Sequence, residues 1–411
     1  MQNPESVQIA YQNLTDVGTM LVAGTLAALA AKRLRIPDIV AFLLAGILLG
    51  PFATGLITIP TDSATNQFIL IFGASYILFD GGAALRLPVL RQVWVSLLVL
   101  ATVGVMLTAL VTGYAAMLAF GLTLPVALLL GCAIAPTDPA TLVPVFKQVK
   151  VREKVAQTVM SESAFNDATG AIMTFALLGI AMGTESFSLR HSLIELVREA
   201  GMGLMVGAAV GYAAAFLVGH KEFALLKHNL PIVTLIVVVT AFMLAVTVHG
   251  SGFMAVFVAG IMLGNNELFG FAVDAIDEER LHEYVNTTGL IFRMFIFILL
   301  GSQVDFALLQ LHWLPAVGVV LVFMFVARPI CVFACTALDP SARWTFQERL
   351  FMSWMRMTGV IPGALAGLLA GMGAPHSDVI TSVTFVAILM TIILQATTTR
   401  WLAARLDLLE R

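Results

Sequence analysis

Two carboxylates fall in one short polar stretch that leads into a long apolar run. Glu162 and Asp167 belong to the sequence Ser-Glu-Ser-Ala-Phe-Asn-Asp at 161–167, and residues 168–182 that follow carry no charge. We therefore predict that the stretch forms the first turns of a membrane-spanning helix. An ionised carboxylate at membrane depth costs about 3 kcal/mol or more unless it is paired or lines a wet cavity. Such groups therefore indicate function.

Helical spacing sorts this stretch into two faces. Residues four apart share a face, so Ser163 and Asp167 point one way, while Glu162 and Asn166 lie about 100° round the helix. A desolvated carboxylate can hold a proton near neutral pH or bind a metal ion, but it cannot do both. We predict that Asp167 exchanges a proton for a cation, with Ser163 as a neutral ligand. A structural ion pair between Asp167 and an arginine is the alternative.

A second polar site interrupts the fifth apolar segment, at Pro136-Thr137-Asp138-Pro139. Each proline lacks a backbone donor and disfavours helix at the residue before it. The helix is predicted to unwind at Thr137 and to restart at Pro139, with Asp138 as N-cap. The freed carbonyl of Thr137 and the carboxylate of Asp138 could ligate a hard cation, and Asp138 could also take a proton. Helix capping by Asp138 is compatible with both roles.

Three further polar residues receive weaker predictions. Glu162 is expected to form a structural ion pair with a buried arginine, Arg356 first and Arg328 second. Asn166 is expected chiefly to tie helices together. Asp80 ends the third apolar segment, where it is either a cation ligand or a solvated carboxylate at the helix exit.

Composition sets the class of protein. The 411 residues are 59% hydrophobic and 11% charged, whereas soluble domains carry about 25% charged residues. The three cysteines lie in apolar runs without metal-ligand spacing, so we expect no disulfide framework and no cofactor. The sequence has no phosphate loop, nucleophile–base pair or basic patch, which argues against an enzyme and against nucleic-acid binding. We predict an all-α polytopic protein whose partner is the lipid bilayer.

Hydropathy marks thirteen apolar segments, and charge orients them. Most of the 22 Lys and Arg residues fall in the odd-numbered connections and the C-terminal tail. The positive-inside rule then places the N-terminus outside and the C-terminus in the cytoplasm of a bacterial-type inner membrane. The segments are 14–31, 36–50, 66–80, 93–119, 122–146, 157–182, 192–219, 230–248, 251–264, 285–301, 312–336, 346–371 and 378–400.

The twelfth segment is predicted to be interrupted as well, at Thr358–Gly363, where glycines flank a proline. The fifth and twelfth segments occupy corresponding places if 14–182 and 230–400 are two inverted repeats of six helices joined by a linker helix at 192–219. Interrupted helices in matching positions of two repeats point to a transport site near the membrane midplane.

Four stretches together resemble the monovalent cation/proton antiporters, specifically the NhaP/NHE-type sodium–proton exchangers. The resemblance covers nearly the whole chain and implies a single membrane domain at 1–411 that forms a homodimer. It also implies a moving core of helices at about 93–182 and 312–400, and a dimerisation scaffold at about 14–80 and 192–301. The stretches are Thr137-Asp138-Pro139, Glu162-Ser163 with Asn166-Asp167, His249-Gly250-Ser251-Gly252 followed by Ala259-Gly260, and Phe295–Gly301 with Ala327-Arg328-Pro329.

The resemblance also implies site residues. Asp80 stands where the family usually has a glutamate that reaches the ion, and Glu162–Arg356 corresponds to the family's core ion pair, although the family's W-x-G-x-R-G context is loose here. Electrogenic relatives carry aspartate where this chain has Asn166, so the resemblance implies electroneutral exchange. The residues expected to surround the cation are Thr137, Asp138, Ser163 and Asp167.

The expected function is therefore electroneutral exchange of Na⁺ or Li⁺ against H⁺ by alternating access. A potassium–proton exchanger of the same fold is the nearest alternative. A cation-coupled solute symporter, a membrane sensor or an ion channel would be different classes. A symporter would need a second solute before Na⁺ moved, and flux through a channel would not be coupled to protons.

Overall fold

The regular structure of the chain is helical in all the residues that the computed structural model describes, which confirms the all-α prediction for this part of the chain. One isolated antiparallel bridge, between Val151 and Leu409, is the single exception there. The described residues are 5–34, 36, 38–85, 87, 93–138, 142, 145–146, 149–184, 189–219, 230–271, 275–304 and 306–409.

Eight helical stretches among these residues are long and apolar enough to cross a membrane, and four shorter apolar helices accompany them. In chain order the helices are α1 (Glu5–Leu34), α2 (Asp38–Leu49), α3 (Ala64–Ala83), α5 (Trp94–Ala101), α6 (Val103–Phe120), α7 (Leu124–Ile134), α9 (Glu153–Ala181), α10 (Leu189–Gly219), α11 (Leu230–Thr247), α12 (Gly252–Gly264), α13 (Ala275–Ser302), α14 (Phe306–Val322), α15 (Arg328–Ala337), α16 (Phe346–Trp354), α17 (Val360–Gly371) and α18 (Ser377–Arg405). Short 3₁₀ turns at Asn266–Phe269 and Pro340–Ala342 and a π-helical turn at Phe323–Ala327 complete the described elements.

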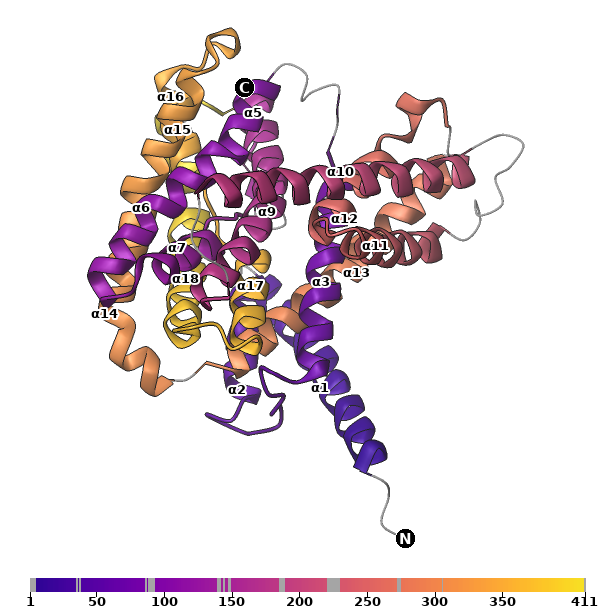
Figure 1. Ribbon diagram of the computed structural model, residues 1–411, viewed down its shortest axis with the longest axis vertical. Coiled ribbons are helices and arrows are strands. Elements are labelled where there is room, and N and C mark those ends of the chain that lie inside the picture. The colour runs from indigo at the N-terminus through magenta and orange to yellow at the C-terminus, as the bar shows by residue number, and fades with distance from the viewer. Residues whose placement is uncertain are drawn as a thin grey trace.

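The helices gather into two groups with a shared middle (Figure 1). Helices α10, α11, α12 and α13 lie on one side of the view, and α6, α14, α15 and α16 lie on the other. Helices α9 and α17 connect the groups, because α9 packs on both α7 and α12, and α17 packs on α3, α13 and α18. The predicted site residues on α9 therefore lie in the interior of the bundle.

The chain is non-helical at both predicted interruptions, although the second one is displaced. Helix α7 ends at Ile134 and residues 135–138 are not part of any helix; the predicted restart at Pro139 lies outside the described residues. The second break covers 355–359, so it begins three residues before the predicted stretch at Thr358–Gly363 and overlaps only its first two residues. The displacement arises because Pro362 sits in the first turn of α17, where a residue needs no intrahelical N–H bond.

The two breaks touch one another. The backbone N–H of Asp138 donates to the carbonyl of Met357 at 2.9 Å. A Cβ added at Gly359 would overlap the side chain of Asp138, so only glycine permits this approach. In a continuous helix, the Asp138 N–H and the Met357 carbonyl would each bond within their own helix. Here they bond to each other, so each break supplies the partner that the other lacks.

A buried carboxylate joins the start of α5 to the turn after α15. Asp339 accepts hydrogen bonds from the Ser96 N–H at 3.0 Å, the Ser96 hydroxyl at 2.6 Å and the Ser341 hydroxyl at 2.5 Å. The indole N–H of Trp344 donates to the same Ser96 hydroxyl at 2.8 Å. Burial opposes the charge on Asp339, but the hydrogen bonds from Ser341 and Ser96 outweigh it and hold the pKa of this carboxyl below its ordinary value of 3.8.

Replacement of this carboxylate should therefore destabilise the protein in a pH-dependent way. We expect Asp339→Asn to weaken the charge-assisted hydrogen bonds and to reduce the free energy of unfolding at neutral pH by about 1–3 kcal/mol. The unfolding temperature should fall accordingly. A carboxylate with a depressed native pKa stabilises the fold above its unfolded pKa and loses that effect as the pH falls through its native pKa. The difference between variant and wild type should thus shrink below about pH 4 in thermal unfolding of the detergent-solubilised protein. The exposed Asp62→Asn serves as control, and a difference that does not vary with pH would contradict the assignment.

Candidate cation-binding site

Helix α9 presents three polar side chains to the break that follows α7. Ser163, Asn166 and Asp167 are buried, with exposed fractions of 0%, 1% and 2%. One turn further along α9, a Cβ at Gly170 would overlap the ring of Pro136, so this glycine lets the break lie directly against the helix. The site requires the break after α7 to lie close to α9, and the missing side chain at Gly170 allows this close packing.

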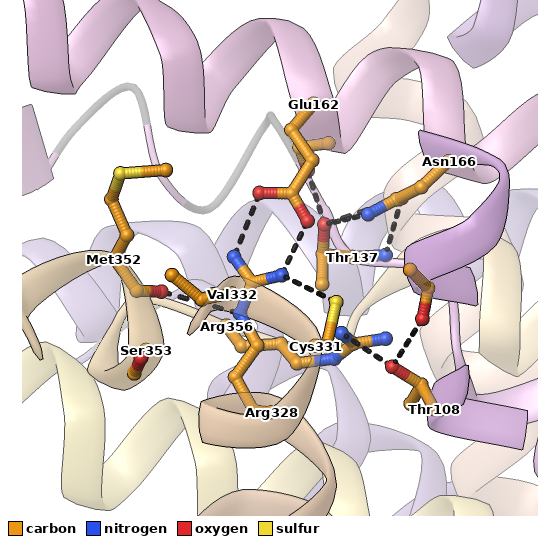
Figure 2. Close-up of polar contacts among 12 residues, drawn as sticks. Thr108, Thr137, Glu162, Asn166, Arg328, Cys331, Val332, Met352, Ser353 and Arg356 are labelled. Atoms are coloured by element: carbon orange, nitrogen blue, oxygen red, sulfur yellow. Dashed lines mark hydrogen bonds and ion pairs between the residues drawn. The ribbon is translucent and has the colours of Figure 1, made fainter. Parts of the chain in front are cut away.

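Asn166 holds the unwound residue Thr137 in place (Figure 2). The backbone N–H of Thr137 donates to Asn166 Oδ1 at 3.0 Å, and Asn166 Nδ2 donates to Thr137 Oγ1, also at 3.0 Å. The Thr137 hydroxyl in turn donates to Ser163 Oγ at 2.8 Å. A backbone N–H that leaves a helix inside the membrane must find another partner, and the amide of Asn166 supplies it. Both ends of that amide are engaged, which fits a tying role.

Asp167 differs from its neighbours because its Oδ1 atom is buried and has no hydrogen-bond partner among the described residues. Asp138, 1% exposed, lies near enough for the two carboxylates to repel each other. Two adjacent buried carboxylates cannot both stay ionised without a compensating cation. Such a pair is chemically suited to hold a proton or a positive ion.

Glu162 forms its ion pair with Arg328, not with Arg356 as first expected. The Arg328 Nη2 donates to Glu162 Oε2 at 2.7 Å, and its Nη1 contacts Oε1 to complete a bidentate pair (Figure 2). Arg328 Nε also donates to the carbonyl of Met352 at 3.2 Å. The π-helical turn at Phe323–Ala327 directly precedes this arginine. Such bulges often occur at functional sites, and no signal in the sequence marks this one.

Arg356 has a different task, which is to join the two breaks. Its Nη2 donates to the carbonyl of Ala135, and its Nη1 donates to Thr108 Oγ1 at 3.3 Å. The guanidinium lies 4.8 Å from the ring centroid of Phe323, which favours a cation–π contact. A carbonyl at the end of α7, lacking its helical donor, is thereby satisfied by a charged group.

Sequence reasoning missed two side chains of α18 that support the second break. Gln395 Oε1 accepts from the backbone N–H of Arg356 at 3.2 Å, and Thr391 Oγ1 accepts from that of Thr358 at 3.0 Å. Both supporting residues are buried, at 1% and 0% exposure. The sequence does contain a signal for Gln395, because it is the lone glutamine in the apolar run 378–400 and a buried amide needs hydrogen-bond partners.

Asp80 lies beside α13. A Cβ added to Gly289 of that helix would be 3.4 Å from Asp80 Oδ2, whereas the next residue, Gly81, faces Ala164 of α9 at 3.7 Å. The described contacts of Asp80 are thus with α13, and its part in cation binding stays a prediction. The side chains that the structure demonstrably brings together are Thr137, Asp138, Ser163, Asn166 and Asp167.

Carboxylate, hydroxyl and carbonyl oxygens are the ligands that hard cations prefer. Two carboxylates with the Ser163 and Thr137 oxygens close by can surround a small cation, and the same carboxylates can carry protons in its absence. The arrangement thus suits competition between a hard cation and a proton.

Comparison with known proteins agrees with this geometry. The chain is 33% identical to Na(+)/H(+) antiporter 1 of Methanocaldococcus jannaschii over 360 residues, which cover 85% of this chain and 81% of that protein. It is 29% identical to the K(+)/H(+) antiporter NhaP of Alkalimonas amylolytica over 398 residues, covering 94% and 66% respectively. The solved structure of the sodium proton antiporter MjNhaP1 from M. jannaschii at pH 8 superposes with a TM-score of 0.84 at 30% identity, over 97% of this chain and 99% of that one. The profile of the family described as "Sodium/hydrogen exchanger, transmembrane" matches residues 17–405. The chain therefore belongs to the transmembrane sodium/hydrogen exchanger family.

Proposed function

We propose that this protein exchanges Na⁺ or Li⁺ against H⁺ across the membrane, with Asp167 as the shared binding group. The observation that carries the proposal is the buried Oδ1 of Asp167, which has no hydrogen-bond partner within the described part of the chain and lies next to Asp138. A protonated Asp167 satisfies the site when the cation is absent, and a bound cation displaces that proton. The competition itself couples the two fluxes, because one carboxylate cannot hold both.

The remaining ligands in this proposal come from both sides of the break. Asp138 supplies a second carboxylate that takes cation or proton, and the Thr137 carbonyl and Ser163 hydroxyl supply neutral oxygens. Glu162 with Arg328 acts as a structural pair beside the site. Asp80 is proposed as an auxiliary acid on the path of the ion. The neighbouring Gly81 of the same helix faces α9, which carries the central carboxylate.

The architecture that we propose for transport has thirteen crossings in two inverted repeats, 14–182 and 230–400, joined by the helix near 192–219. Core helices at about 93–182 and 312–400 move against a scaffold at about 14–80 and 192–301. The scaffold pairs with a second copy as a homodimer in a plasma-membrane location. The N-terminus is placed outside and the C-terminus in the cytoplasm, because the basic residues concentrate in the odd connections.

Potassium is the second candidate cation, because relatives that are named K(+)/H(+) antiporters align over most of the chain. An assay on the purified protein in liposomes separates the two. An imposed pH gradient should collapse on addition of Na⁺ or Li⁺ and respond much less to K⁺ or Rb⁺. A response to K⁺ as large as that to Na⁺ would favour the second candidate. No response to any of the four ions would overturn the proposal of cation/proton exchange.

We propose electroneutral exchange, one cation for one proton, because the chain resembles exchangers whose electrogenic relatives carry aspartate where Asn166 stands here. We therefore expect the exchange rate to be unchanged when a membrane potential is imposed with a potassium-selective ionophore. Movement of one net charge per cycle would instead make the rate depend on the potential, since 100 mV is worth about 2.3 kcal/mol per charge. A rate that changes several-fold with potential would show that a second charge moves with the cation.

A further inference from the structure

Helix α17 carries a glycine on every turn of one face. Gly363, Gly367 and Gly371 recur every four residues within the helix and therefore share a face, and Gly359, four residues earlier, is the last residue of the break before it. We refer to these four residues as the glycine stripe. The stripe faces α3 and α13, since atoms of those helices, or of the loop before α3, are nearest at its last three positions.

The stripe begins at the candidate cation site, where Gly359 meets the side chain of Asp138. A Cβ at Gly363 would be 3.3 Å from Leu300 Cδ2 of α13, and one at Gly367 would be 2.7 Å from Leu70 Cδ1 of α3. The helical part of the stripe thus leaves one face of α17 without side chains from Gly363 to Gly371, and Gly359 before it touches Asp138. Two leucines cover it.

The last glycine of the stripe meets backbone as well as a side-chain tip. A Cβ at Gly371 would be 2.5 Å from the carbonyl oxygen of Thr61 and would also overlap Gln67 Nε2. Gln67 Nε2 itself donates to the Thr61 carbonyl at 2.7 Å, which anchors the loop before α3 against the end of α17. The end of α17 and the loop before α3 are therefore in tight contact.

A cavity of about 200 Å³ lies beside this closure. Its polar wall includes the carboxylate of Asp378 and the amide of Gln303, and Leu300 belongs both to its wall and to the cover of the glycine stripe. A space of this size with several polar groups can hold several waters. The complete lining is Thr61, Leu300, Gln303, Val304, Leu309, Gly367, Ala370, Ser377, Asp378, Thr381, Ser382 and Phe385.

We infer that this cavity is the outer mouth of the cation path, which receives a hydrated monovalent cation, and that Leu300 and Leu70 on the glycine stripe form its closed gate. The inference rests on the proposed function. Carboxylate, hydroxyl and amide oxygens suit a hydrated cation, and the stripe connects the cavity at Gly367 to Asp138 at Gly359. To open the path, α17 must separate from α3 and α13. The glycines let it return to close contact.

Alanine substitutions along the stripe test the closing contact. Gly371→Ala places a methyl group against the Thr61 carbonyl, which cannot rotate away, whereas Gly367→Ala meets the movable tip of Leu70. Gly318→Ala on α14 is the matched control, because no atom lies within 4 Å of its added Cβ. Overpacking of a tight contact shifts the equilibrium away from the closed state, so Gly371→Ala should exchange about ten-fold more slowly. Gly318→Ala should match wild type, and Gly367→Ala should fall between.

Thiol labelling gives a second readout that a merely unstable variant would not reproduce. In a Phe297→Cys background, which places a thiol beside Gly363 and leaves both gate leucines in place, Gly371→Ala should speed labelling by a membrane-impermeant maleimide from outside, since the gate stays open. The three native cysteines are buried and provide the background rate. Unchanged labelling together with wild-type exchange in Gly371→Ala would overturn the gate. An equal slowing in Gly318→Ala would also do so.

The two proposals fail in different ways. If the chain is not a cation/proton exchanger, the wild-type protein will not collapse a pH gradient with any monovalent cation, but the labelling difference will persist. If the gate is wrongly placed, wild-type exchange will be intact and the labelling difference will be absent.

Discussion

Asp167→Asn is expected to abolish cation-driven proton exchange and to leave the fold intact or more stable. The asparagine has nearly the same shape but releases no proton and offers a cation only a neutral oxygen, so both fluxes lose their shared group. The wild-type carboxylate is buried, and one of its oxygens has no hydrogen-bond partner among the residues that the structure describes, which costs free energy in the folded state. Its removal relieves that cost, as is common where function opposes stability.

Two measurements on the same preparation check this expectation. Exchange in liposomes should fall to the level of empty vesicles, while the unfolding temperature in detergent should equal or exceed that of wild type. The exposed Asp62→Asn controls for the loss of one carboxylate elsewhere. Proton release on addition of Na⁺ that survived in Asp167→Asn would remove this residue from the mechanism.

The Glu162–Arg328 ion pair is expected to produce the largest stability effects in the molecule. Both side chains are buried, with exposed fractions of 2% and 1%, and their contact is bidentate. Loss of one partner leaves an uncompensated charge in a dry interior, which typically costs about 3–5 kcal/mol. Glu162→Leu and Arg328→Met should therefore each lower the unfolding temperature steeply. Arg328→Lys should recover only part of the loss, because an ammonium cannot bind both carboxylate oxygens in a planar fork.

The double variant distinguishes a structural pair from a directly functional one. Replacement of both partners by apolar residues removes the desolvation cost of both charges, so Glu162→Leu with Arg328→Met should be much more stable than either single variant. Retained exchange in the double variant would confirm a structural role. A loss of stability in the double variant equal to the sum of the losses in the two single variants would contradict a coupled pair. Arg405→Met, at an exposed position, controls for the loss of an arginine.

Much of the fold was readable from local patterns, because the membrane imposes strict rules on each segment. A helix must satisfy its own backbone groups in lipid, so long apolar runs predict helices without reference to the rest of the chain. The unwound stretch at Thr137 was predictable for the same reason, since two nearby prolines act on the backbone around them. The polar stretch around Asp167 was likewise conspicuous against the uncharged run that follows it.

Tertiary structure alone decided which of these groups meet. Glu162 and Arg328 are 166 residues apart, and nothing in the local sequence distinguishes Arg328 from Arg356 as the partner. The π-helical turn before Arg328 and the packing of α15 against α5 and α6 make that choice. Packing also set the second break at 355–359, where Thr391 and Gln395 of α18 accept the N–H groups that the interrupted helix leaves open.

The sequence by itself thus determined the helices, the first interruption and the chemical types of the site residues, because these depend on local backbone rules and on the cost of charge in lipid. Tertiary structure decided the pairing of Glu162, the position of the second break, the joining role of Arg356 and the cavity at the end of α17. These depend on contacts between helices that are distant in the chain, where shape complementarity selects one arrangement among several that composition allows equally.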